Sequence, residues 1–71
     1  MSEKMTQLEL QWTVAEKYVE TDLPYEMYQF ADDICVEHAY PIQEDGSQEV
    51  LIFVRKIIPP EDVEAIMEDL T

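Results

Sequence analysis

The feature that most constrains this chain is its excess of carboxylates. Its 71 residues include 17 Asp and Glu but only 4 Lys and Arg, which gives a formal net charge of −13. A block of like charges would indicate a disordered tail. Here the acids are interleaved with apolar residues, which make up 46% of the chain and are enough to build a core. The sequence therefore predicts one acidic α+β domain over residues 1–71, with its charge spread over a folded body.

The same charge argues against several classes of function. Nucleic acids and anionic membrane surfaces repel such a protein, so we expect no direct binding to DNA, RNA or membrane. The longest apolar run, Val50–Val54, is far too short to span a bilayer. Cys35 is the only cysteine, so it forms no internal disulfide, and Met1–Leu8 lacks the apolar segment of a signal peptide. These features favour a reducing cytoplasm.

In the first half of the chain, apolar periodicity predicts a strand and then a helix. Leu8–Val14 alternates apolar and polar residues, which is typical of a strand with one buried face. Thr21–Pro24 combines capping residues with a proline suited to a first helical turn. The helix is expected to end near Ile34–Val36. Its apolar face has spacings of three or four residues, at Leu23, Met27, Phe30, Ala31 and Ile34.

The second half predicts a hairpin and a C-terminal helix. Val36–Gln43 and Glu49–Ile57 are the expected strands, joined by a turn at Asp45-Gly46. Pro59-Pro60 ends the second strand, and residues 61–70 have the spacing of an amphipathic helix. The order β-α-β-β-α with a right-handed crossover predicts a small three-stranded sheet, antiparallel or mixed, with both helices on one face.

No group of residues matches a catalytic or metal site. Cys35 and His38 have ligand-like spacing, but zinc needs about three or four protein ligands. Asp32 and Asp33 are adjacent, so on a helix they would point in different directions and would not share a proton. Phosphate-binding glycine loops and nucleophile elbows are absent from the sequence. We therefore expect no enzyme activity, no cofactor and no metal.

The spacing of the acids is more informative. On the predicted helix, Asp22, Glu26, Asp33 and Glu37 follow steps of roughly four residues, with Gln29 at the missing place. Four helical residues rise about 6 Å, close to the separation of successive phosphates on a DNA strand. An ordinary solvated helix face gives the same pattern, so both interpretations remain open.

Further residues extend this candidate binding surface. Tyr25 and Tyr28 fall off the best apolar face and are candidate contacts for a partner. The acids expected to widen the row or to form a second one on the hairpin are Glu16, Glu20, Asp32, Glu44, Asp45 and Glu49.

In size, composition and charge layout, the chain resembles the small acidic DNA-mimic inhibitors encoded by phages and mobile elements. Among these, it is most similar to the host-takeover inhibitors of the bacterial histone-like protein HU. The residues that carry the resemblance are Glu16, Glu20, Asp22, Glu26, Asp32, Asp33, Glu37, Glu44, Asp45 and Glu49. The resemblance implies a host DNA-binding protein as the partner and the bacterial cytoplasm as the location.

Two hypotheses of function follow. In the first, the chain covers the basic DNA-binding surface of a host nucleoid-associated protein. In the second, it is an inhibitor or adaptor that binds a non-DNA site on RNA polymerase, a CRISPR effector or a toxin, mainly through an apolar strand edge, Tyr25, Tyr28 and Pro59-Pro60. A homodimer is compatible with either, because an edge strand and an amphipathic helix are available for self-association.

Overall fold

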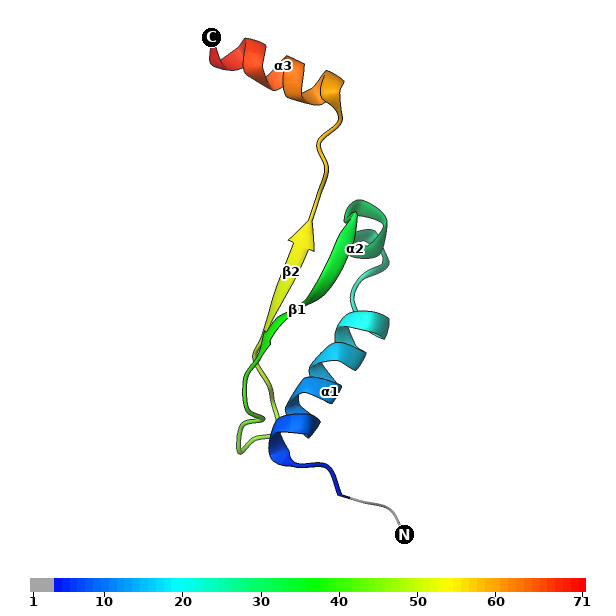
Figure 1. The fold of residues 1–71 in the computed structure, drawn as a ribbon, viewed down its shortest axis with the longest axis vertical. Coiled ribbons are helices and arrows are strands. Elements are labelled where there is room, and N and C mark those ends of the chain that lie inside the picture. The colour runs from blue at the N-terminus through cyan, green and yellow to red at the C-terminus, as the bar shows by residue number, and fades with distance from the viewer. Residues whose placement is uncertain (1–3) are drawn as a thin grey trace.

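A computed structural model, which describes residues 4–71, shows an α+β chain with a single antiparallel hairpin (Figure 1). Residues 1–3, the start of the segment considered above for a signal peptide, lie outside the described range. The elements in chain order are α1 (Gln7–Thr21), α2 (Tyr25–Phe30), β1 (Asp33–Ala39), β2 (Val50–Arg55) and α3 (Pro60–Leu70). The observed order is therefore α-α-β-β-α, with a two-stranded sheet in the described residues.

The strand predicted over Leu8–Val14 is wrong, because these residues belong to α1. A capping box starts the helix: the Thr6 hydroxyl accepts the Glu9 amide at 3.1 Å, and the Glu9 carboxylate accepts the Thr6 amide. No proline or glycine interrupts the next 15 residues. The apolar–polar alternation of Leu8–Val14 covers only the first half of this helix and does not form a strand. The buried residues of the helix, Ala15 and Val19, are four residues apart, as expected for one helical face.

The second helix is shorter than predicted. It ends at Phe30, and Asp33–Ala39 forms β1 instead of the last turns of a helix. Ile34 and Val36 are β-branched and alternate with the exposed residues Asp33, Cys35 and Glu37, so they suit a strand that packs one face against α1. As a consequence, the predicted helical stripe of acids does not exist: Asp22 caps the C-terminus of α1, Glu26 lies on α2, and Asp33 and Glu37 lie on β1.

The predicted hairpin and last helix are present, but the bounds of the first strand are wrong: it covers Asp33–Ala39 instead of Val36–Gln43, while the second covers Val50–Arg55. Gly46 has φ +89°, the left-handed conformation that the Asp-Gly turn predicts. The strands pair from Asp33 with Arg55 to Ala39 with Val50, with a bulge between Val36 and His38. The proline pair starts α3 with Pro60 in its first turn.

The core of a single chain is very small. Among residues 4–71, the buried apolar side chains are Ala15, Val19 and Ala39, at 1%, 5% and 0% exposure, where α1 packs on β1. Two amides tie this layer together: Gln11 donates to the Ala39 carbonyl at 3.1 Å, and Gln48 donates to the Gln11 carbonyl at 2.7 Å. One face of the sheet is therefore covered over β1, while much of β2 stays open.

The C-terminal helix lies beyond the end of β2, away from α1 (Figure 1). Lys56 donates to the Phe30 carbonyl at 2.8 Å and stacks over the Phe30 ring, and the Asp32 carboxylate accepts the Ile57 amide. These contacts hold the connection extended. None of the described helices is long and apolar enough to cross a lipid bilayer.

The capping box gives a first prediction. Thr6→Ala should lower the free energy of unfolding by about 1 kcal/mol, because it leaves the Glu9 amide without its hydroxyl acceptor. Urea denaturation followed by circular dichroism measures this change. Thr13→Ala, at an exposed position inside the same helix, is the matched control and should leave stability unchanged or slightly higher. Equal effects of the two substitutions on the free energy of unfolding would show that the Thr6 hydroxyl does not stabilise the start of α1.

Candidate functional site: an acidic groove beside β1

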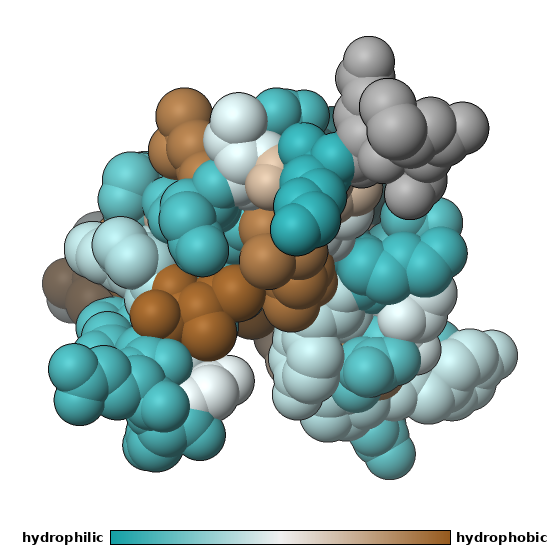
Figure 2. Space-filling view, turned by 90° about the horizontal axis from the view of Figure 1, so that it is seen from below, coloured by the Kyte–Doolittle hydropathy of each residue, from teal (hydrophilic) through white to brown (hydrophobic). Residues whose placement is uncertain are grey.

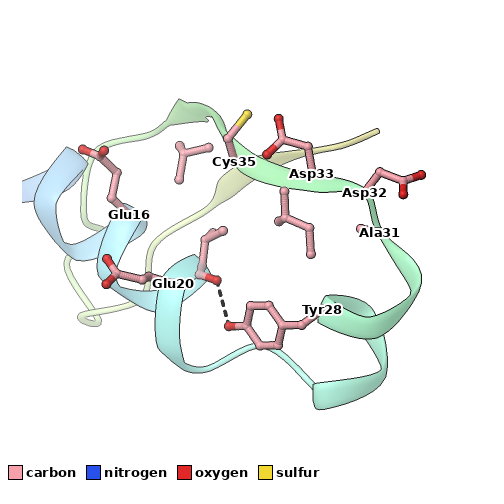
Figure 3. A pocket seen from close by; sticks show the side chains of 10 residues that line it. Glu16, Glu20, Tyr28, Ala31, Asp32, Asp33 and Cys35 are labelled. Atoms are coloured by element: carbon pink, nitrogen blue, oxygen red, sulfur yellow. Dashed lines mark hydrogen bonds between the residues drawn. The ribbon is translucent and has the colours of Figure 1, made fainter. Parts of the chain in front are cut away.

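A groove of about 430 Å³ runs along the outer side of β1, between α1, α2 and the strand. Figure 3 shows Glu16 and Glu20 of α1 on one side of it, and Asp32 and Asp33 at the start of β1 on the other. We call these four residues and the space between them the acidic groove. The residues that line the groove include no Lys, Arg or His.

The floor of the acidic groove is apolar. It is formed by Val19 of α1, Ala31, and the two inward residues of β1, Ile34 and Val36. An aliphatic chain with a cationic end fits such a surface, because its stem lies on the apolar floor while its charge reaches the carboxylates. This combination suits lysine and arginine side chains of a protein partner.

The carboxylates of the acidic groove are spread out, not gathered at one point. Among residues 4–71, no group of three His, Cys, Asp or Glu side chains is close enough to hold a metal ion. Of the pair with ligand-like spacing, Cys35 lines the acidic groove, whereas His38 packs edge-on against the Trp12 and Tyr40 rings. The separated acids can instead meet several cations at once.

Tyr28 has a structural role at the end of the groove. Its hydroxyl donates to the Val19 carbonyl at 2.8 Å and accepts the Leu23 amide at 3.1 Å, so it joins the last turn of α1 to α2 (Figure 3). The predicted partner contact at Tyr28 is therefore already used within the chain. Tyr25, by contrast, is 71% exposed and free to contact a partner.

The structure brings together only some of the predicted site residues. Glu16, Glu20, Tyr28, Asp32 and Asp33 share the groove. Asp22, Glu26 and Glu37 are exposed but are not among its lining residues, and the hairpin acids Glu44, Asp45 and Glu49 lie on or beside the connecting loop. The apolar floor was not predicted from the sequence, although Ile34 and Val36 are two positions apart, which is the spacing of one face of a strand.

The hairpin loop contains one carboxylate with a perturbed titration. The Asp45 carboxylate accepts the Ser47 hydroxyl at 2.6 Å and the Ser47 amide at 2.9 Å. Both hydrogen bonds favour the ionised form and lower the pKa of Asp45 below its ordinary value of 3.8. These two hydrogen bonds tie the Asp45 side chain to the backbone and side chain of Ser47 within the turn.

Comparison with protein-family models, with curated proteins and with solved structures gives no match for this chain. The assignment of function therefore depends on the chemistry of the acidic groove.

Loss of the Tyr28 hydroxyl gives a second prediction. Tyr28→Phe should lower the free energy of unfolding by about 1 kcal/mol, because the half-buried Val19 carbonyl and Leu23 amide lose their partner. Tyr25→Phe is the matched control, since it removes the same hydroxyl from an exposed ring of the same helix. Chemical denaturation of both variants measures the difference. A Tyr28→Phe protein as stable as the control would show that the two hydrogen bonds of the Tyr28 hydroxyl do not stabilise the junction of α1 and α2.

The Asp45 turn gives a third prediction. Ser47→Ala should raise the pKa of Asp45 toward 3.8, whereas Ser47→Thr keeps the hydroxyl and should keep the pKa low. The depressed pKa means that this carboxylate stabilises the turn above its unfolded pKa and loses that effect as the pH falls through the folded value. Titration of the side-chain carboxyl carbon by NMR measures both variants. An unchanged pKa in Ser47→Ala would show that the hydroxyl is not the cause.

Proposed function

We propose that this protein is a DNA mimic that binds the basic DNA-binding surface of a host protein and blocks access of DNA to it. The observation that carries the proposal is a net charge of −13 on a folded chain, with Glu16, Glu20, Asp32 and Asp33 around one groove that contains no cation. A surface that binds DNA phosphates through Lys and Arg offers the complementary charges. The proposed role is that of a binding protein and not of an enzyme.

The acidic groove replaces the helical stripe as the proposed phosphate-mimicking surface. Its carboxylates come from α1 and from the start of β1. The buried Ala15 and Val19 pack α1 on β1, and the Tyr28 hydroxyl joins the last turn of α1 to α2. A fixed array loses little conformational entropy on binding, so more of each ion pair remains as affinity. The free edge of β1 also lies beside the groove and offers backbone groups to an extended basic segment.

The energetics of such a complex would be those of DNA binding. Each Lys or Arg of the partner already holds a phosphate or a counter-ion, and a carboxylate substitutes for it. The long-range field of a chain with this charge would also accelerate association with a basic surface. Affinity should therefore fall steeply as salt rises, and DNA and this protein should exclude each other.

A bacterial nucleoid-associated protein of the HU type is the partner we propose, in the cytoplasm of the host. Such a protein presents a basic surface to DNA without reading base sequence, so recognition by charge layout alone would be sufficient.

A fourth prediction tests this function. In the triple variant Glu16→Gln, Glu20→Gln, Asp33→Asn, inhibition of a labelled DNA duplex binding to purified HU should weaken by about tenfold or more, since three exposed ion pairs are lost. Asp32 is left unchanged because its carboxylate holds the Ile57 amide. Competition is measured by fluorescence anisotropy at low and at physiological salt.

The matched control changes three acids of α3, with the variant Glu64→Gln, Glu68→Gln, Asp69→Asn. It neutralises the same charge outside the groove and should weaken inhibition by less than about threefold. If wild-type protein in excess leaves DNA bound to HU, this partner is wrong. If both triple variants lose inhibition equally, the effect is one of overall charge, and the groove is not the binding site.

One observation favours the second candidate, an inhibitor of a non-DNA site. Tyr25, Ile66 and Leu70 are more than half exposed, and Ile66 and Leu70 lie four residues apart on one face of α3, where a partner can cover both. A partner that binds through them would be retained at high salt. The salt dependence measured in the same competition assay therefore separates the two candidates.

A further inference from the structure

The isolated chain exposes far more surface than a stable monomer of its mass. Its accessible surface is 6190 Å², while a compact monomer of this mass exposes about 4600 Å². Its radius of gyration is 17.7 Å, against about 11 Å for a compact domain of this length. Figure 2 shows apolar side chains reaching the surface between hydrophilic groups at the hairpin end of the molecule. The excess, about 1600 Å² per chain, is what an obligate homodimer typically buries.

The two edges of the hairpin differ in charge. The edge of β1 is lined by carboxylates, with Asp33 and Glu37 on the strand and Glu16 and Glu20 beside it. Charged residues of this kind prevent an edge strand from pairing with another copy of itself. The edge of β2 has no such protection, because Val50–Val54 is entirely apolar and Leu51, Phe53 and Val54 are 41%, 43% and 41% exposed.

We propose that two copies of this chain associate through the free edges of their β2 strands, about a two-fold axis, to form one continuous antiparallel sheet. The register that centres the axis on Ile52 places the whole apolar run Val50–Val54 opposite itself. In that register Leu51 lies opposite Phe53 of the second copy, and Val50 lies opposite Val54, which are favourable cross-strand pairs.

The charges at the ends of β2 select the same register. Residues 49 and 55 are equally distant from Ile52, so Glu49 of each copy lies opposite Arg55 of the other. Both residues are exposed and both have the same strand parity, so their side chains lie on the same face of the sheet. The dimer therefore gains two Glu49–Arg55 pairs of opposite charge where the two acidic chains meet. In this register no carboxylate of one β2 strand lies opposite a carboxylate of the other.

The same contact closes an open part of each chain. A groove of about 460 Å³ lies between α1 and β2, with Val14, Tyr18, Val50 and Ile52 among its lining residues. It borders the free edge of β2, so the hairpin and α1 of the second copy would cover it. The two-fold axis also brings α3 to the hairpin end of the second copy, where it is no longer isolated. This interface is separate from the acidic groove and does not depend on the proposed function.

A fifth prediction tests the dimer by sedimentation equilibrium. The wild-type protein should have about twice its chain mass of 8.4 kDa. Leu51→Lys with Phe53→Lys, which places lysine opposite lysine, should raise the dissociation constant at least about a hundredfold. Cys35→Lys is the matched control: it adds a lysine to the same sheet face but on β1, and it should leave the dimer intact. Circular dichroism confirms that each variant is folded.

The register is tested by exchanging charges. Glu49→Arg alone and Arg55→Glu alone should each weaken the homodimer, because like charges then face each other twice. A mixture of the two variants should form the heterodimer preferentially, since each pair across the axis is again of opposite sign. Native mass spectrometry measures the species. A wild-type monomer at all concentrations, a dimer that survives the double lysine change, or a random mixture of the charge variants would each overturn the proposal or its register.

Discussion

The contact between α1 and β1 holds the rest of the molecule in place. Ala15 and Val19 on the helix and Ala39 on the strand are the residues most completely removed from water, and all are small. Small side chains let the helix approach the strand closely, but they bury little apolar area, so the hydrophobic contribution of the contact is modest. Hydrogen bonds from the Gln11 and Gln48 amides complete it, and the Tyr28 hydroxyl holds α2 to the end of α1. The position of every groove carboxylate depends on this one layer.

This thin core explains how the chain accommodates its charge. Acids repel one another, and a larger compact body would hold them around a low-dielectric interior. In the elongated chain the acids lie on exposed parts of α1, α2, β1, the hairpin loop and α3, where solvent and ions screen them. The cost is apolar surface left open on β2 and α3, and the proposed self-association would offset that cost. A composition rich in both acids and apolar residues therefore accounts for the high charge and for the proposed assembly.

The sequence predicted the hairpin well and the first half of the chain poorly, for physical reasons. Asp45-Gly46 and Pro59-Pro60 act through local backbone geometry, so their meaning does not depend on the rest of the fold. Leu8–Val14 has an alternation that fits a strand, and only the capping box at Thr6 and Glu9 identifies it as the start of a helix. Ile34 and Val36 fit the apolar face of a helix and also one face of a strand. Their packing against α1 favours the strand, and such a tertiary contact cannot be seen in a local pattern. The acids of the groove were predicted as candidate contacts, but the groove itself was not. It forms only because α1, which carries Glu16, packs beside β1, which carries Asp33.

The bare edge of β2 also bears on colloidal behaviour. Five apolar residues with high β-propensity and no charge, on a strand with a free edge, form the kind of segment that can template cross-β assembly. At neutral pH the charge of −13 keeps molecules apart, so the proposed pairing would be limited to an arrangement that separates the acids. Near the isoelectric point of about 4.1 that repulsion disappears while the edge remains. The carboxylates that are proposed to imitate DNA therefore also keep this short strand from growing into a fibril.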